Sequence, residues 1–92
     1  MSDKKSVELK IINERGLHAR AAASFVKAIE GLDAEVEVER IGQTVDGSSI
    51  MGLMMLAAAK DTSIKISATG PEADLAIQNL TNLINNKFGE EK

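Results

Sequence analysis

The chain has 92 residues, no cysteine, one histidine and a formal net charge of −3 at pH 7. These values predict a single domain spanning residues 1–92, and they exclude disulfide bonds, thiolate metal sites and sites built from several histidines. An acidic chain with only 2% aromatic residues also lacks the features that bind nucleic acid or anionic membranes.

The first part of the chain predicts a strand, a helix and a second strand. Residues 7–11 alternate between apolar and charged side chains, which is typical of a half-buried strand. From Ala19 the apolar residues fall at helical spacing on one stripe, and Gly31 is well placed to end that helix. Residues 34–39 alternate again, and their three glutamates predict a strand with an acidic exposed face.

The middle of the chain predicts a hairpin followed by a second helix. A turn at residues 40–43 and a short strand at residues 44–45 would complete the hairpin. Ser48 and Ser49 stand where a helix N-cap is expected, because a serine hydroxyl accepts a hydrogen bond from a free amide at a helix start. The helix is predicted over residues 50–59. It is apolar on nearly all sides, so it is either largely buried or exposed for a functional reason.

The last part predicts one more strand and one more helix. Residues 64–69 alternate, and Pro71 suits the first position of the following helix, where a backbone N–H is not needed. Gly89 is expected to end this helix. Its apolar stripe consists of Ala73, Ala76, Ile77, Leu80, Leu83, Ile84 and Phe88.

The predicted order of elements is βαββαβα. Strands with one polar face favour an antiparallel sheet with one face in water, and the helices must bury their stripes on the other face. The predicted fold is therefore α+β: a two-layer, open-faced β-sandwich in which three helices cover one face of a four-stranded antiparallel sheet. No apolar run approaches the roughly 20 residues of a membrane span, and no signal-peptide core is present. We therefore expect a cytoplasmic protein that does not insert into membranes.

His18 is the residue most suited to chemistry, because histidine alone among these side chains ordinarily titrates near neutral pH. It lies between a strand-ending loop and a helix start, where free backbone amides favour an anion. Arg20 adds a guanidinium group that can donate paired hydrogen bonds to phosphate. A neutral imidazole nitrogen is a nucleophile, so the site could carry a phosphoryl group. These local features alone fit an ordinary surface histidine at least as well, because anion sites at helix starts are common and often empty.

Two segments resemble one protein family. The segment Gly16 to Val26 (GLHARAAASFV) resembles the active-site segment of HPr, the phosphocarrier of the bacterial phosphoenolpyruvate-dependent phosphotransferase system. The segment Ser49 to Met54 (SIMGLM) resembles the regulatory-serine segment of the same family. The predicted order of strands and helices also fits this family over essentially the whole chain.

The resemblance implies a role for each matching residue. His18 matches the histidine that accepts the phosphoryl group on its Nδ1 atom, and Arg20 matches the arginine that stabilises the phosphorylated state. Gly16, Leu17 and Ala19 match the loop that presents the histidine. The implied donor is enzyme I, ultimately phosphoenolpyruvate, and the implied acceptor is an enzyme IIA-type protein in sugar uptake or nitrogen-related regulation. Such a carrier needs no cofactor or metal, is not a stand-alone enzyme, and is expected to be a monomer.

Two positions depart from the family pattern. Many members have proline where this chain has Ala21, and some have threonine where it has Ala19. Proline would fix the backbone at the helix start, and threonine would offer a hydroxyl group to the phosphoryl group. The nucleophile, the amides and the arginine are retained, so we expect these differences to affect the rate of transfer and not its occurrence.

Ser49 matches the family's regulatory serine, which an HPr serine kinase/phosphorylase modifies in bacteria that have one. Its setting alone favours a plain helix N-cap. A phosphate at a helix N-terminus is tolerated electrostatically, so phosphorylation is expected to repel an acidic partner and to leave the fold intact. The expected docking residues are Ile50, Met51, Leu53 and Met54, because flexible methionine side chains suit the binding of several partners.

Two other functions remain open. The first is a regulatory protein-binding module that acts through Ser49 and the methionine-rich helix, in which replacing His18 with alanine would leave activity intact. The second is a hydrolase or transferase with His18 as the base. Against this function, the chain lacks a cysteine, a second histidine and paired carboxylates near His18 in the sequence. Carboxylates distant in the sequence could still approach His18 in space.

Overall fold

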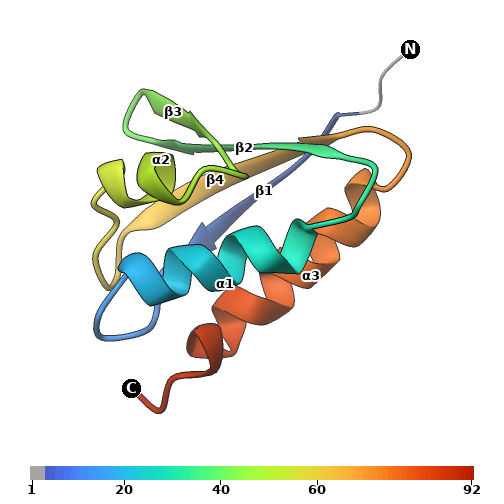
Figure 1. Ribbon diagram of the computed structural model, residues 1–92. Helices are drawn as coiled ribbons and strands as arrows, with labels where there is room; N and C mark the ends of the chain where they lie inside the picture. The colour runs from blue at the N-terminus through green and yellow to red at the C-terminus, as the bar shows by residue number, and fades with distance from the viewer. Residues whose placement is uncertain (1–3) are drawn as a thin grey trace.

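The computed structural model describes residues 4–92, which form a four-stranded antiparallel sheet with its helices packed on one face (Figure 1). The strand order is β1-β4-β2-β3. This arrangement confirms the predicted two-layer α+β fold and the predicted order of elements. The elements are β1 (Lys4–Lys10), α1 (Ala19–Ile29), β2 (Glu35–Arg40), β3 (Gln43–Asp46), α2 (Ile50–Met55), β4 (Ser63–Thr69), α3 (Ala73–Asn85) and a 3₁₀ turn, η1 (Lys87–Gly89).

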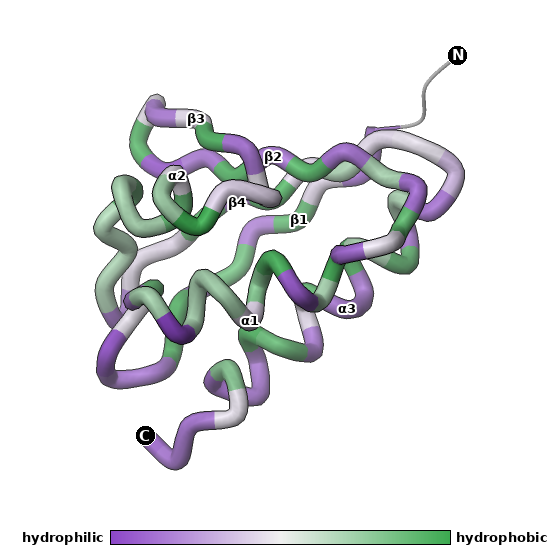
Figure 2. The backbone as a smooth tube through the Cα atoms, viewed as in Figure 1, coloured by the Kyte–Doolittle hydropathy of each residue, from purple (hydrophilic) through white to green (hydrophobic). Residues whose placement is uncertain are grey.

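The central strands β4 and β2 bury one face and expose the other. Their antiparallel register pairs Val38 with Ile66 and Val36 with Ala68, and all four side chains are buried beneath the helices. The glutamates of β2 alternate with the valines and remain exposed. Figure 2 shows this alternation of hydrophobic and hydrophilic residues along β2. Such cross-strand apolar pairs stabilise the sheet and place its apolar residues on one side.

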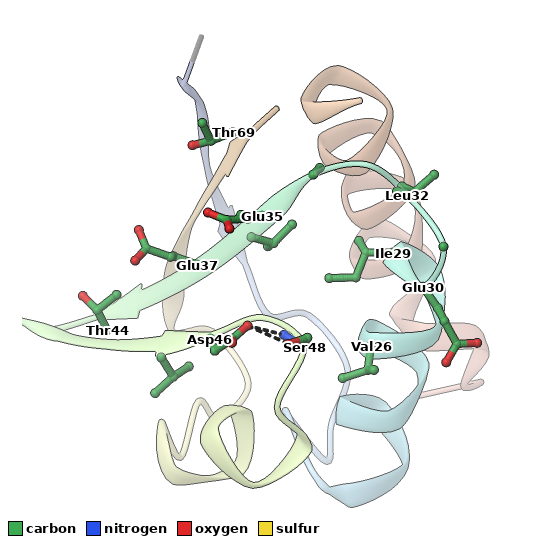
Figure 3. Close-up of a pocket in the computed structure, with 14 residues that line it drawn as sticks. Val26, Ile29, Glu30, Leu32, Glu35, Glu37, Thr44, Asp46, Ser48 and Thr69 are labelled. Atoms are coloured by element: carbon green, nitrogen blue, oxygen red, sulfur yellow. Dashed lines mark hydrogen bonds between the residues drawn. The ribbon is translucent and has the colours of Figure 1, made fainter. Parts of the chain in front are cut away.

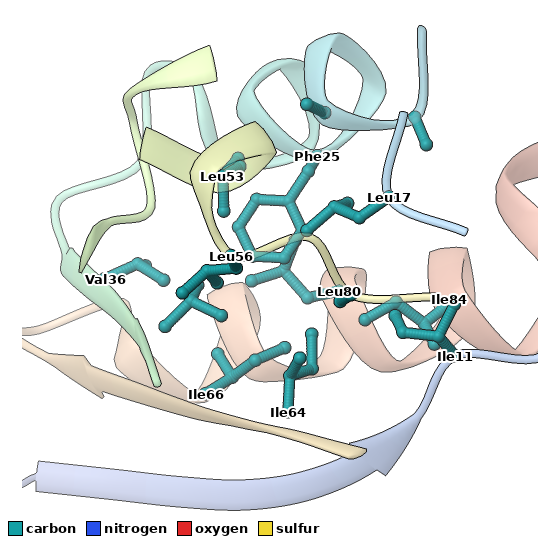
Figure 4. Close-up of a cluster of buried hydrophobic side chains, with 14 of the residues drawn as sticks. Ile11, Leu17, Phe25, Val36, Leu53, Leu56, Ile64, Ile66, Leu80 and Ile84 are labelled. Carbon is teal, nitrogen blue, oxygen red and sulfur yellow. The ribbon is translucent and has the colours of Figure 1, made fainter. Parts of the chain in front are cut away.

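The core lies between this face of the sheet and the helices. Phe25 of α1 is fully buried, and Figure 4 shows it among Leu17, Leu53 and Leu80. Burial of each such large apolar side chain contributes roughly 1.5–3 kcal/mol to folding. Because Leu17 directly precedes His18, the core itself anchors the chain at the start of α1. None of the helices in the described part of the chain combines the length and the hydropathy that crossing a membrane requires.

The prediction of a helix over residues 50–59 is wrong at its C-terminal end, because α2 ends at Met55. Ala57 has a φ of 51°, a left-handed conformation that a right-handed helix cannot contain. The residues that follow instead reach toward the segment after β1. The carbonyl of Ala58 accepts a hydrogen bond from the amide of Leu17 at 2.9 Å, and the amide of Asp61 donates one to the carbonyl of Ile11 at 2.7 Å.

The predicted boundaries of the last helix are also wrong. Pro71 precedes the N-cap residue Glu72, so Pro71 is outside the helix and not at its first position. At the other end α3 stops at Asn85, before Phe88. Phe88 is buried, but it belongs to η1 and has a φ of 56°. The chain therefore turns back after α3, and Phe88 enters the core from this turn and not from the helical stripe.

Candidate functional site

His18 is the N-cap residue of α1. Its backbone is extended, with φ −80° and ψ −178°, and its carbonyl accepts a hydrogen bond from the amide of Ala22 at 2.8 Å. Its Nδ1 atom accepts a hydrogen bond from the backbone amide of Arg20 at 3.3 Å. The ring thus takes the place of the oxygen that usually caps a helix. Nδ1 therefore lies at the N-terminus of α1, where the helix dipole favours negative charge.

The loop before His18 is fixed against the segment that links α2 to β4. Gly16 has a φ of 67°, and a Cβ atom added to it would lie 2.5 Å from the carbonyl oxygen of Ala58. The adjacent Leu17 is buried and bonds to the same carbonyl through its amide. Gly16 and Leu17 therefore fix the backbone directly before His18, and the close approach of Ala58 explains why a glycine is needed.

Arg20 lies in the first turn of α1 and is exposed. Within residues 4–92 its guanidinium group forms no hydrogen bond or ion pair, so its five donors are available to an anion at the helix start. Ala19 is exposed beside it, whereas Ala21 is completely buried. The side chain of Ala21, one of the two positions that depart from the pattern of the resembled family, therefore packs into the core.

Glu90 belongs to this site, although sequence reasoning missed it. Its Oε2 atom lies 2.5 Å from Nε2 of His18. Its Oε1 atom accepts a hydrogen bond from Nδ2 of Asn13 at 3.1 Å, and the same Nδ2 donates to the carbonyl of Gly16 at 2.9 Å. The two side chains of the His18–Glu90 pair are only 15% and 14% exposed. The contact therefore joins residues far apart in the sequence and partly shielded from water.

The C-terminal segment reaches His18 because it reverses direction after α3. Lys87, Phe88 and Gly89 all have positive φ, and the buried ring of Phe88 anchors the turn. Beyond Glu90, the carbonyl of Lys92 accepts a hydrogen bond from the amide of Glu14 at 2.8 Å. In Figure 1 this segment ends on the same side of the molecule as the loop before α1.

Burial alone would raise the pKa of the Glu90 carboxyl group. The hydrogen bonds from His18 and Asn13, together with the charges of His18 and Arg15, outweigh that effect and hold the pKa below its ordinary value of 4.5. Glu90 is therefore a carboxylate at neutral pH. As a carboxylate it can only accept hydrogen bonds.

Ser49 is the N-cap residue of α2, as predicted, and its Oγ atom accepts a hydrogen bond from the amide of Gly52 at 2.9 Å. The next turn of the helix presents large apolar side chains to solvent. Leu53 is completely buried, so the prediction of Leu53 as a docking residue is wrong, because it belongs to the core beside Phe25. Met55, absent from the predicted set, is exposed. The exposed fractions are 40% for Ile50, 70% for Met51, 40% for Met54 and 65% for Met55.

The turn that leads to Ser49 is closed by Asp46. Its Oδ1 atom accepts hydrogen bonds from the amide of Ser48 at 2.9 Å and from the hydroxyl group of Ser48 at 2.8 Å. These two bonds, the backbone one first, lower the pKa of Asp46 below its ordinary value of 3.8.

We expect this turn to weaken in acid. A depressed pKa in the folded state stabilises the protein above pH 3.8, and that contribution is lost as the pH falls through the lower folded value. An NMR titration should place the midpoint of Asp46 below 3.8, with the Ser48 amide signal moving at the same pH. Asp46→Asn should remove this movement. A Ser48 amide that does not follow the titration of Asp46 would contradict the prediction.

An open groove of about 880 Å³ lies elsewhere, between the C-terminal end of α1 and the β2–β3 hairpin (Figure 3). Apolar residues such as Val26 and Ile29 line it together with acidic residues such as Glu35 and Glu37. His18 does not line this groove, so the groove is separate from the start of α1.

Comparisons with protein families, individual proteins and solved structures all identify similarity to the same family. A family model described as "PTS HPr component phosphorylation site" matches residues 5–86. The phosphocarrier protein HPr of Neisseria meningitidis serogroup A is 48% identical over 87 residues, which cover 95% of this chain and 96% of the relative. The structure of HPr-C-His from Thermoanaerobacter tengcongensis has a TM-score of 0.91 and 41% identity, covering 96% of this chain and 99% of that chain. A structure of an HPr dimer from the same organism has a TM-score of 0.75 and 41% identity, covering 94% of this chain and 99% of that chain.

Proposed function

The chain belongs to the HPr family, the phosphocarriers of the phosphotransferase system, and we propose that it accepts a phosphoryl group on Nδ1 of His18 and passes it to a partner protein. The observation that carries this proposal is the position of His18 as the N-cap of α1. Its nucleophilic nitrogen faces backbone amides that can receive phosphoryl oxygens. Members of the family are phosphoryl carriers and not stand-alone enzymes.

The transfer is a displacement at phosphorus. The lone pair of Nδ1 forms the new N–P bond while the bond from phosphorus to the donor breaks, and the electron pair of that bond stays with the donor. The Arg20 amide loses its hydrogen bond to Nδ1 as the N–P bond forms. This amide, the amide of Ala19 and the guanidinium group of Arg20 are the proposed donors to the phosphoryl oxygens. The same steps in reverse deliver the group to the acceptor.

We propose enzyme I as the donor and an enzyme IIA-type protein as the acceptor, in sugar uptake or nitrogen-related regulation. His18, Arg20 and Glu90 all come from one chain, so the site is complete in a monomer. We therefore propose that the protein acts as a monomer, although one related structure is that of a dimer. Light scattering at micromolar concentration tests this proposal, and the mass of two chains would contradict it. We also propose that it acts in the cytoplasm.

The exposed residues of α2, Ile50, Met51, Met54 and Met55, are proposed as part of the docking surface. A cluster of exposed apolar side chains on a small protein is typical of an interaction site. Met51→Ala should weaken binding of enzyme I by about 1 kcal/mol, because truncation removes a side chain that becomes buried on docking. Leu75→Ala is the matched control, since Leu75 is also an exposed apolar residue but lies on α3. Calorimetry that finds equal affinities for the two variants would contradict this surface.

Ser49 is proposed as a regulatory phosphorylation site for a serine kinase/phosphorylase. Ser49→Asp places negative charge beside the docking residues, and we expect binding of enzyme I to weaken roughly tenfold while the fold stays intact. Gln78→Asp adds a similar charge on the exposed face of α3 and should leave binding unchanged. If Ser49→Asp binds enzyme I with the affinity of the wild type, negative charge at the start of α2 does not control docking.

The experiment that tests the function is phosphorylation by phosphoenolpyruvate and enzyme I, followed by intact mass. We expect a gain of one acid-labile phosphoryl group that is absent in His18→Ala. No gain by the folded wild-type protein, with a donor from the same organism, would reject the carrier function. It would favour the regulatory binding module, for which the exposed methionines of α2 are the supporting observation.

A further inference from the structure

We propose that Glu90 is a positioning residue that holds His18 in the Nε2–H tautomer and thereby keeps Nδ1 unprotonated, so that its lone pair can form the bond to the phosphoryl group. This inference rests on the proposed function of His18. The tautomer of a histidine is set by the hydrogen bonds of its two ring nitrogens, because one nitrogen donates and the other accepts in the neutral ring.

Two independent contacts specify the same tautomer. On one side of the ring, Nε2 lies 2.5 Å from a carboxylate oxygen of Glu90, which can only accept, so Nε2 must carry the proton. On the other side, Nδ1 lies 3.3 Å from the backbone amide of Arg20, which can only donate, so Nδ1 must be unprotonated. Glu90 therefore stands on the side of the ring away from the proposed phosphoryl position and does not occupy it.

The Glu90 carboxylate is itself fixed by Asn13. Asn13 is completely buried, and its two Nδ2 hydrogens are directed to the Gly16 carbonyl and to Glu90. Both neighbours are acceptors, so the orientation of this amide is determined. Its Oδ1 atom is buried without a hydrogen-bond partner in the described part of the chain, which is an unfavourable state. The Asn13 side chain thus fixes both the Gly16 carbonyl and the Glu90 carboxylate through Nδ2, while its Oδ1 atom forms no hydrogen bond.

Glu90 also matches the charge that phosphorylation creates. When the lone pair of Nδ1 forms the N–P bond and Nε2 keeps its proton, the ring becomes positively charged. The carboxylate of Glu90 balances this charge through the Nε2–H bond, and no proton has to move. When the acceptor takes the phosphoryl group, the electron pair of the N–P bond returns to Nδ1 and the ring is neutral again.

Glu90→Gln is the sharpest test, because Asn13 determines how the new amide is oriented. The glutamine oxygen should face the Nδ2 donor of Asn13, which leaves its NH₂ group facing Nε2 of His18. Nε2 then has to accept, and the ring should shift toward the Nδ1–H tautomer. Glu91→Gln is the matched control, since it removes the same charge one residue further along, where the side chain is exposed.

We expect the ¹⁵N signals of the His18 ring to indicate the Nε2–H tautomer in the wild type and in Glu91→Gln, and a shift toward Nδ1–H in Glu90→Gln. Phosphorylation by enzyme I and phosphoenolpyruvate should slow about tenfold in Glu90→Gln. Removing a buried carboxylate that is hydrogen-bonded to a catalytic histidine can lower the rate by a much larger factor. The effect expected here is smaller because the His18–Glu90 pair is partly open to water. Glu90→Asp, which can still only accept, should keep the wild-type tautomer.

A merely structural role of the C-terminal segment would lower the melting temperature of Glu90→Gln and leave the tautomer and the rate at their Glu91→Gln values. That result would overturn the inference. A wild-type protein that gains no phosphoryl group would reject the proposed function instead, and the ring signals would still report whether Glu90 sets the tautomer.

Discussion

Replacing Arg20 with methionine should slow phosphoryl transfer to His18 about 10²-fold, the loss typical when a donor aimed at developing charge is removed. Arg20 is exposed in the first turn of α1, two residues after His18, and its backbone amide already donates to Nδ1 of the ring. Its planar donors match phosphoryl oxygens in a way that a single ammonium group does not. Arg20→Lys should therefore recover only part of the rate.

The stability of Arg20→Met should stay close to that of the wild type, because methionine is a good helix former and the arginine head group has no partner to lose within residues 4–92. Lys27→Met is the control, since it removes a positive charge from the last turn of the same helix. Rapid-quench measurements of single phosphorylation events compare the variants. Equal rates for Arg20→Met and Lys27→Met would mean that Arg20 does not contact the phosphoryl group.

Gly16→Ala should lower the free energy of unfolding by about 3 kcal/mol, from two added effects. Gly16 has a φ of 67°, which an alanine adopts only with strain, and the new Cβ would lie 2.5 Å from the Ala58 carbonyl oxygen. That carbonyl accepts the hydrogen bond from the amide of Leu17, so it cannot move away without breaking the contact that anchors His18.

Gly42→Ala separates the two effects. Gly42 has a similar φ of 78°, but nothing lies within 4 Å of an added Cβ atom. Gly42→Ala should therefore lower the free energy of unfolding by the backbone strain alone, about 1 kcal/mol. Urea unfolding of both variants measures the difference. If Gly16→Ala is no less stable than Gly42→Ala, the close approach of Ala58 does not constrain the loop.

The fold could be predicted because its signals are local. The alternation in β2 and β4 and the apolar stripe of α1 are properties of neighbouring residues, and they place each element correctly. The length of α2 could not be predicted in this way. Residues 57–59 are all alanine, a strong helix former, and the helix ends before them because their backbone bonds to the loop before His18. Tertiary contacts therefore override local propensity at this point.

The candidate site likewise contains residues that local sequence patterns predict and residues that only tertiary contacts bring together. The pattern around His18 predicts its place at a helix start, and the structure confirms that place. Glu90 could not be predicted, because it reaches His18 only after Lys87 and Phe88 adopt positive φ, which neither residue type signals. The assignment of Leu53 failed for a related reason, since which side of a short apolar helix is buried depends on the layer beneath it.

The strand order has a consequence for how fast the protein can fold. β1 is an edge strand that pairs only with β4. Lys10 must therefore pair with Ser63, and Lys4 with Thr69, before this edge of the sheet can form. Closing so long a loop costs chain entropy before any contact is gained, whereas α1 and the β2–β3 hairpin need only near neighbours. The docking of β1 on β4 is therefore the step expected to limit the folding rate, and it adds a strand beside the one that carries Ile64 and Ile66 into the core.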